Sequence, residues 1–291
     1  MKKLFTILFI LSIAFSAFAQ EALEILFLQE QIREEGDRLG FTEKVLEEEF
    51  GFNVEQDLIA TAPTDGYDLA VIHEGVGSTN ADQVRYQIAP LPLLLLKPWN
   101  VRSGGLGWAL DPGNWENNSP AIIIEMMHPI LTGLPDIEDL DVGDEILIAG
   151  GDMTNGVAWV PASIGEAAGV EVIAVNANVD VPDQLSLLAI EPGTTLNDVQ
   201  LENRAVIFTI SISVWETNLE YDLKLTESGL KILENACYWV AGKEIPGSVS
   251  TLSRNSFSQA SVYPNPSSGI VKMMLDQTVP ILAVKVSGID G

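Results

Sequence analysis

The sequence predicts an α/β fold in which a mostly parallel sheet is covered on both faces. Short runs that are apolar almost throughout alternate with segments whose apolar residues recur at helical spacing. Strands of a parallel sheet have this near-continuous apolar character because both of their faces are buried. The one cysteine, Cys237, rules out an internal disulfide, so the fold must depend on a large hydrophobic core. A hydrophobic content of 47% is consistent with such a core.

The strands and helices can be assigned in chain order. The predicted strands are the apolar runs at residues 23–28, 67–72, 91–97, 121–124, 145–149, 170–175, 185–190 and 204–212. The predicted helices run from Thr42 to Gly51, from Asn80 to Tyr86 and from Thr226 to Ala241, where Gly242 follows. Each of them starts at a Thr or Asn, the residue types that cap helix N-termini, and glycine ends the first and the last.

Residues 1–19 are predicted to be a cleavable secretory signal peptide. Lys2 and Lys3 form a positive n-region, residues 4–15 are almost entirely apolar, and Ala17-Phe18-Ala19 has the small-x-small pattern of a cleavage site. We expect cleavage before Gln20 and export from the cytoplasm. The alternative, a membrane anchor, is disfavoured because the apolar stretch is shorter than the ~20 residues that span a bilayer. No later segment is predicted to span a membrane.

The charge is strongly acidic, with 15 Lys and Arg against 41 Asp and Glu. Such a surface repels polyanions, so nucleic acid and anionic lipid are not expected as partners. Export without disulfides is typical of a bacterial envelope or surface protein rather than a small disulfide-linked domain.

The composition changes after Gly242. Residues 243–260 are rich in Ser, Thr, Asn, Gly and Pro and are predicted to be a linker. Residues 261–291 then contain Tyr263-Pro264-Asn265-Pro266, Gly269 and two short apolar runs, and they end on the turn dipeptide Asp290-Gly291. This tail resembles the first part of the C-terminal sorting domain of type IX secretion cargo. A Pro-rich linker with two strands is the alternative.

That resemblance implies a small β-sandwich, present here in part, that the type IX secretion machinery of the outer membrane recognises. It also implies that the protein is secreted, or held at the outer-membrane surface of a Gram-negative bacterium. We predict that deleting residues 250–291 leaves the thermal midpoint of the preceding domain nearly unchanged and abolishes secretion. A fall in the midpoint of more than about 4 °C would show that the tail stabilises that domain.

Residues 20–242 resemble the ThuA-like group of the class I glutamine amidotransferase-like superfamily. The matching features are the strand that ends at His73, the segment His128-Pro129-Ile130 with Gly133-Leu134-Pro135, and the closing run at 218–242. The resemblance implies a flavodoxin-like three-layer sandwich, in agreement with the pattern of strands and helices.

The motifs that would support catalysis are missing from the sequence. Amidotransferase chemistry needs a thiolate on a strand-to-helix turn, but Cys237 lies in the middle of a predicted helix and should be a buried, unreactive thiol. There is no G-x-S-x-G and no H-E-x-x-H, and two histidines with one cysteine cannot form a His- or Cys-rich zinc site. We therefore expect neither a metal nor a cofactor. The acidic residues at 136–145 are interpreted as a solvated loop, with calcium binding as the alternative.

A ligand site is nevertheless expected at the carboxyl ends of the parallel strands, at residues 73–78 and 97–100, as in other open α/β sheets. His73 and Glu74 lie there as candidate general base and partner, or as a polar strand cap. Candidate ligand-binding residues are Ser78 and the loop tryptophans Trp99, Trp108 and Trp115, which could stack on sugar rings or close over the edge of the core. The leading hypothesis is an exported, non-catalytic domain that binds carbohydrate or another small ligand. The alternative is a glycan-active hydrolase that uses His73 and Glu74.

Overall fold

The computed structural model describes the main part of the chain and two short strands of the tail. The described residues are 22–30, 41–73, 76–86, 91–111, 113–135, 137–148, 157–177, 184–210, 225–246, 261–263 and 272–274. The chain divides into two compact units, Met1–Gly247 and Ser248–Gly291. The predicted signal peptide at 1–19 and most of the predicted linker lie outside the described residues.

The N-terminal strands form the parallel part of the main sheet. β1 (Glu24–Gln29), β2 (Asn53–Leu58), β3 (Leu69–Ile72), β4 (Leu93–Leu95) and the much later β13 (Ala205–Phe208) are neighbours in the order β2-β1-β3-β4-β13. Every pairing within this group is parallel. The carboxyl ends of these strands therefore meet along one edge of the sheet.

The rest of the sheet is antiparallel. β10 (Gln184–Ile190) pairs with β13, and the order continues through β9 (Val170–Asn176), β6 (Ala121–Ile123) and β7 (Glu145–Ile146). β8 (Val157–Pro161) pairs with both β10 and β5 (Asn114–Ser119). The structure agrees with an α/β fold, but the eleven-stranded sheet is mixed and not mostly parallel as predicted. The connection from β9 to β10 is too short for a crossover helix, so these strands must run antiparallel.

Helices are few in the described part of the chain, and the helix predicted at Asn80 to Tyr86 is of the 3-10 type. α2 (Phe41–Lys44) continues into η2 (Val45–Glu49), and α4 (Glu227–Val240) is the longest described helix. The 3-10 helices are η3 (Ala81–Tyr86), η4 (Pro98–Val101), η5 (Pro129–Leu131), η6 (Ile137–Asp139) and η7 (Ala162–Ile164). A separate ribbon pairs β11 (Thr195–Leu196) with β12 (Val199–Gln200). No helix among the described residues is both long and apolar enough to cross a membrane.

The start of α4 follows the sequence prediction closely. Thr226 has an extended backbone, and its side-chain oxygen accepts a hydrogen bond from the Gly229 N–H at 3.0 Å. This contact satisfies one of the N–H groups that a helix leaves unpaired at its first turn. The same hydroxyl donates to the Leu147 carbonyl at 2.6 Å. The cap therefore also fixes the helix to the segment that follows β7.

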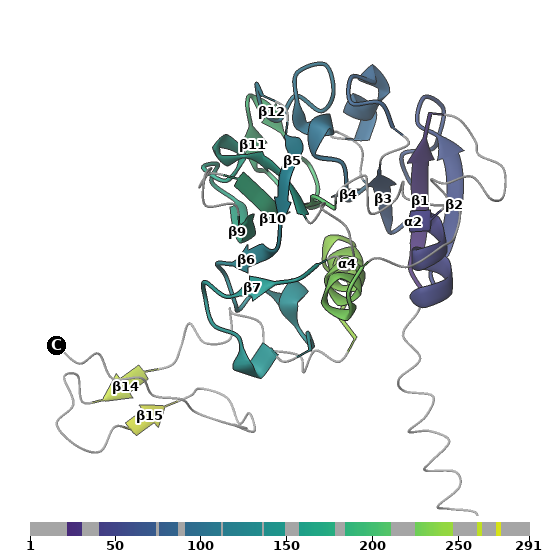
Figure 1. The fold of residues 1–291 in the computed structure, drawn as a ribbon. Helices are drawn as coiled ribbons and strands as arrows, with labels where there is room; N and C mark the ends of the chain where they lie inside the picture. The colour runs from purple at the N-terminus through teal and green to yellow at the C-terminus, as the bar shows by residue number, and fades with distance from the viewer. Residues whose placement is uncertain are drawn as a thin grey trace, which may run out of the picture. The chain divides into compact units, whose positions relative to one another are not determined.

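The core lies on both faces of the sheet, as the near-continuous apolar strands predicted. Along β1, Ile25 and Phe27 point into one cluster, whereas Leu26 and Leu28 point into the other. The first cluster is completed by the buried face of α4, which packs against β4 and β13 in the middle of the sheet (Figure 1). The second cluster is covered by 3-10 helices and loops, with Trp108 among its large side chains.

The second unit contains one described pair of strands. β14 (Ser261–Tyr263) runs antiparallel to β15 (Lys272–Met274). Tyr263 of the predicted sorting motif lies in β14. Pro264, Asn265, Pro266 and Gly269 lie outside the described residues.

Candidate functional site

The carboxyl ends of β1, β3 and β4 bring three chain segments together. Leu28 is aligned with Ile72, and Ile72 with Leu95, so the residues that follow these strands are close neighbours. The order of the strands reverses at β1, because β2 lies on one side of it and β3 on the other. Such a reversal leaves a crevice at the carboxyl edge, where open α/β sheets bind their ligands.

His73 is buried at this edge, directly after β3. Its side chain is 1% exposed, and its ring stacks on Phe27 with centroids 4.1 Å apart and planes inclined by 21°. Because side chains alternate along a strand, Phe27 and His73 face the side of the sheet that α4 covers. In this arrangement His73 packs as part of the core face. Glu74, its predicted partner, lies outside the described residues.

A series of amides extends from the same edge towards the start of α2. The Gln29 side chain donates to the Gln56 side-chain oxygen, and Gln56 donates in turn to the Glu43 carboxylate. These contacts connect β1, β2 and α2. The remaining side-chain oxygen of Gln29 is buried without a hydrogen-bond partner among the described residues.

The loop after β3 is held from both sides by charged residues that follow the neighbouring strands. A Glu30 carboxylate oxygen accepts hydrogen bonds from the Gly77 N–H and the Asn80 side-chain amide, both at 2.8 Å. On the other side, Lys97 donates to the Val76 carbonyl at 3.0 Å. A Cβ atom at Gly77 would lie only 2.6 Å from that Glu30 oxygen, so the contact needs glycine there.

Sequence reasoning missed Glu30 as a site residue, although the carboxyl-end rule pointed to the segment 97–100 that contains Lys97. Glu30 comes two residues after the predicted strand 23–28, so the same rule, applied to that strand as well, would have found it.

Two further buried amides lie beyond the loop after β3. Gln83 donates to the Gly77 carbonyl at 2.9 Å, but its side-chain oxygen has no partner among the described residues. Asn100, in η4, is fully buried, and neither its side-chain nitrogen nor its side-chain oxygen has a partner there. A buried polar group without a hydrogen bond costs roughly 1–3 kcal/mol. Unpartnered amides are therefore unusual in a native core and call for a physical reason.

Ser78 lies next to Asn100. A Cβ atom at Gly105 would be 2.5 Å from the Ser78 carbonyl oxygen and 2.6 Å from that of Asn100. The loops after β3 and β4 therefore meet around Gly105. Gly104 and Gly107, on either side of it, have φ of +87° and +73°, backbone conformations that other residues rarely adopt. A glycine-rich segment thus packs against the Asn100 backbone.

The three predicted tryptophans are not brought together as a stacking platform. Trp99 is half-buried in η4. Trp108 is 2% exposed and belongs to the core cluster on the loop-covered face, so a sugar ring cannot stack on it in this arrangement. Trp115 lies in β5, but its side chain is outside the described residues. Of the two predicted tryptophans whose side chains are described, Trp99 is the one available for stacking.

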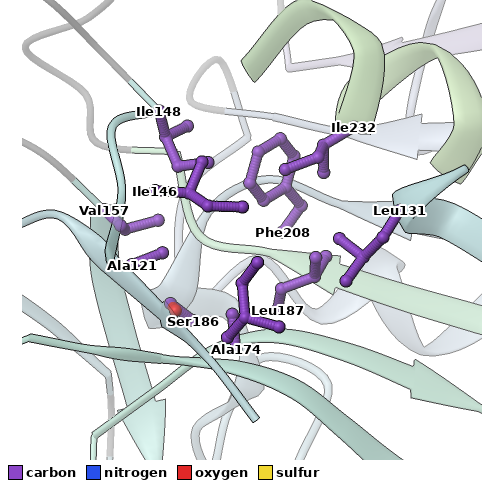
Figure 2. Close-up of a pocket in the computed structure, with 11 residues that line it drawn as sticks. Ala121, Leu131, Ile146, Ile148, Val157, Ala174, Ser186, Leu187, Phe208 and Ile232 are labelled. Carbon is purple, nitrogen blue, oxygen red and sulfur yellow. The ribbon is translucent and has the colours of Figure 1, made fainter. Parts of the chain in front are cut away.

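Two hollows lie away from this edge. One is a small cavity of about 10 Å³ between α4 and the antiparallel strands. Its lining is apolar except for the Ser186 hydroxyl (Figure 2). The other is an open groove of about 360 Å³ near the start of β1 and β2, lined in part by Glu24, Glu47 and Glu55. Neither is lined by a predicted site residue. A third hollow, of about 10 Å³ near the start of β4 and β13, is lined in part by Trp108.

Cys237 and His128 have structural environments. The Cys237 side chain is fully buried in α4 beneath the sheet, which confirms the predicted burial. The His128 Nδ1 accepts a hydrogen bond from the Ile130 N–H at 3.2 Å and so caps η5. In the acidic loop, the Asp141 N–H donates to Asp144. Among the described residues, no three His, Cys, Asp or Glu side chains group closely enough to hold a metal ion.

The buried thiol gives a prediction for alkaline pH. Burial, reinforced by the nearby Glu234 carboxylate, raises the pKa of Cys237 well above its ordinary value of 9.0. The unfolded chain releases this proton above about pH 9 while the folded chain keeps it, so the stabilisation is complete below that pH and is lost as the pH rises. Above about pH 9, the free energy of unfolding should fall about 1.4 kcal/mol per pH unit more steeply in the wild type than in Cys237→Ala.

Urea unfolding at a series of pH values measures this difference. Tyr86, whose pKa burial raises to about 12, is present in both proteins and cancels in the comparison. Equal slopes for the two proteins would show that the thiol titrates alike in the folded and unfolded states.

Comparison with known proteins adds limited information. No family model matches the chain, and no curated protein matches it. Among solved structures, a protein of Parabacteroides merdae named as ThuA-like aligns over 77% of this chain and 91% of its own, at 10% identity and a TM-score of 0.45. An overlap at this level carries no argument about function, and the ThuA-like assignment stays a prediction from the sequence motifs.

Proposed function

We propose that this chain is an exported protein of the type IX secretion pathway, secreted or held at the cell surface. Its flavodoxin-like, ThuA-like domain binds a carbohydrate or another polyhydroxy ligand without transforming it. The observation that carries the binding proposal is the Asn100 amide, which is buried behind the carboxyl edge of the parallel strands and has no hydrogen-bond partner in the described part of the chain. The parallel order β2-β1-β3-β4-β13 supports the flavodoxin-like part, since that family arranges its strands 2-1-3-4-5.

The chemistry of the edge suits hydroxyl groups. An amide offers two N–H donors and a carbonyl acceptor, and a sugar hydroxyl both donates and accepts. Asn100 and Gln83 together offer unsatisfied atoms in the segments that follow β3 and β4. Trp99, half-buried beside Asn100 in η4, offers an aromatic face.

Catalysis is not part of the leading proposal, because the groups that would perform it are buried. The Cys237 thiol is enclosed in the core, and the His73 ring is packed against Phe27. The alternative, a glycan hydrolase, is favoured by one observation: His73 lies at the point where the strand order reverses. Under that alternative, the purified chain would release reducing sugar from a glycan substrate, and His73→Asn would abolish the release.

The binding proposal is tested with a glycan array probed by the full chain, followed by titration of the glycan that binds. Asn100→Leu should weaken binding at least about tenfold. The same substitution should leave the free energy of unfolding unchanged or raise it, because it removes an unpaired buried amide. The proposal would be refuted if Asn100→Leu bound the glycan as tightly as the wild type, or if no glycan on the array bound the wild-type chain.

Asn235→Leu is the matched control. Asn235 is equally buried, but its amide donates to the Ile130 and Thr132 carbonyls at 2.9 and 2.8 Å. The Asn235 side-chain oxygen has no partner among the described residues, but its nitrogen makes both of these bonds. Removing the nitrogen leaves the two carbonyls unpaired, so this variant should lose stability and keep its affinity. Export is tested separately by N-terminal sequencing of the released protein, which should begin at Gln20.

A further inference from the structure

The charges of this chain are segregated along the sequence. Between Arg102 and Arg204 every Lys, Arg, Asp or Glu position is acidic. That stretch forms β5 to β12 and so builds most of the antiparallel half of the sheet. Lys44, Arg85 and Lys97, by contrast, lie within the stretch that builds the parallel strands β1 to β4. The acidic side chains of this stretch therefore have no basic side chain within the same stretch to offset them.

An apolar strip lies on the outer side of β6 and β7, which run side by side in Figure 1. Alternate residues of this pair, such as Ile123 and Ile146, point inward to the core. Their neighbours point outward and are joined by exposed side chains from the adjoining turns. We define the β6–β7 patch by its residues, which are Ile122, Ile124, Met127, Val142 and Leu147. Met127 is 83% exposed and Leu147 is 53% exposed.

The backbone contacts place the patch residues along one strip, with Glu145 opposite Ile122 on the same outer face. Ile122 is aligned with Glu145 across the strand pair, so Leu147 lies at one end of the strip. The Gly143 N–H donates to the Ile123 carbonyl at 2.8 Å, which places Val142 beside Ile124 at the other end. Most large apolar side chains of the described chain are buried, so several exposed ones in one strip are notable.

Acidic side chains surround this strip. The Glu125 carboxylate accepts a hydrogen bond from the Met127 N–H at 2.8 Å, and so lies next to the patch. The remaining acidic residues belong to the segment between β6 and β7 and to β7 itself, and they are Glu138, Asp139, Asp141, Asp144 and Glu145. All of them are exposed, and they lie within a few residues of the patch.

We propose that the β6–β7 patch docks a cationic amphipathic polypeptide segment, one that presents Leu-like side chains to the patch and Lys or Arg to its acidic border. The charge of the surface selects this occupant. A second copy of this chain, with its own acidic surface, is repelled, as are anionic lipid and nucleic acid. A partner that carries basic residues around an apolar face matches both properties of the surface.

The test measures binding of the full chain to a synthetic amphipathic peptide built from Leu and Lys, by fluorescence anisotropy. The double variant Met127→Ser/Leu147→Ser should weaken binding at least about tenfold, because it removes two apolar side chains from the contact. Glu138→Gln/Asp139→Asn should weaken binding and reduce its dependence on salt. Leu110→Ser is the matched control: Leu110 is 78% exposed but lies in the segment after η4, outside the patch.

The expected pattern is loss of binding in the patch variant and wild-type binding in Leu110→Ser, with circular dichroism unchanged in both. Oligolysine of the same length should bind more weakly than the Leu/Lys peptide, and a Leu/Glu peptide should not bind. The proposal is overturned if the Leu/Lys peptide does not bind, or if oligolysine or the Leu/Glu peptide binds equally well. It is also overturned if Met127→Ser/Leu147→Ser and Leu110→Ser bind the Leu/Lys peptide with the same affinity.

Discussion

Truncation of Phe27 to alanine should lower the free energy of unfolding by about 3–5 kcal/mol, the usual cost of removing a buried aromatic ring. Phe27 lies in the middle of β1 and is fully buried. Its strand pairs with β2 on one side and β3 on the other, and its ring supports the buried His73 ring. The loss is a large part of the total stability of about 5–15 kcal/mol typical of a domain. Urea unfolding followed by circular dichroism measures it.

Phe27→Leu separates the loss of volume from the loss of the stacked ring. Leucine keeps most of the buried hydrocarbon, so this variant should recover the larger share of the stability lost in Phe27→Ala. If Phe27→Leu is as destabilised as Phe27→Ala, the contact with His73 dominates. A cost below about 1.5 kcal/mol for Phe27→Ala would contradict the position of this ring in the core.

Gly229→Ala should destabilise the protein, although the same change in an ordinary helix is stabilising by about 1 kcal/mol. A Cβ atom on Gly229 would lie 2.3 Å from the Ile148 carbonyl oxygen and 3.2 Å from its carbon. These are backbone atoms of a segment that the Thr226 cap holds against the helix, so they cannot rotate away. Overpacking of this kind costs about 1–3 kcal/mol, and the net change in unfolding free energy should therefore be a loss.

Ser228→Ala provides the control in the same turn of α4. Ser228 is only partly buried, and alanine has the higher helix propensity, so this variant should be neutral or slightly stabilised. Opposite signs for the two alanine variants would establish the close contact between α4 and Ile148. A gain of stability in Gly229→Ala would show that the helix starts further from that carbonyl.

Much of the fold could be predicted from the sequence, because burial on two faces leaves a clear signal. The strands β1, β3, β4, β10 and β13 overlap predicted apolar runs. Strand direction left no such signal. All seven residues of β10 are buried although its pairings are antiparallel, so its sequence looks like that of a parallel strand. β2 was missed for the opposite reason: it lies at the edge of the sheet, and its sequence Asn-Val-Glu-Gln-Asp-Leu is largely polar.

The candidate site was only partly predictable. The carboxyl-end rule located His73 and Ser78, since it needs only the ends of strands. The burial of Trp108 and Asn100 depends on how the loop after β4 folds back over the sheet, and residue type alone does not determine that. Both residue types are common in exposed loops, so their sequence context gave no warning that they would be enclosed.

The position of β13 has a consequence for the order in which the chain assembles. β13 is made after β5 to β12, yet it lies between β4 and β10 in the middle of the sheet. Until residues 205–208 are synthesised, β4 and β10 each present an unpaired edge, and unpaired edges invite wrong pairing. The contact of β13 with β4 also joins residues far apart in sequence, and such contacts form slowly. α4, which packs against β4 and β13, is made later still. The centre of the sheet therefore closes only when nearly the whole domain has been synthesised, and its two halves become one cooperative unit in that late step.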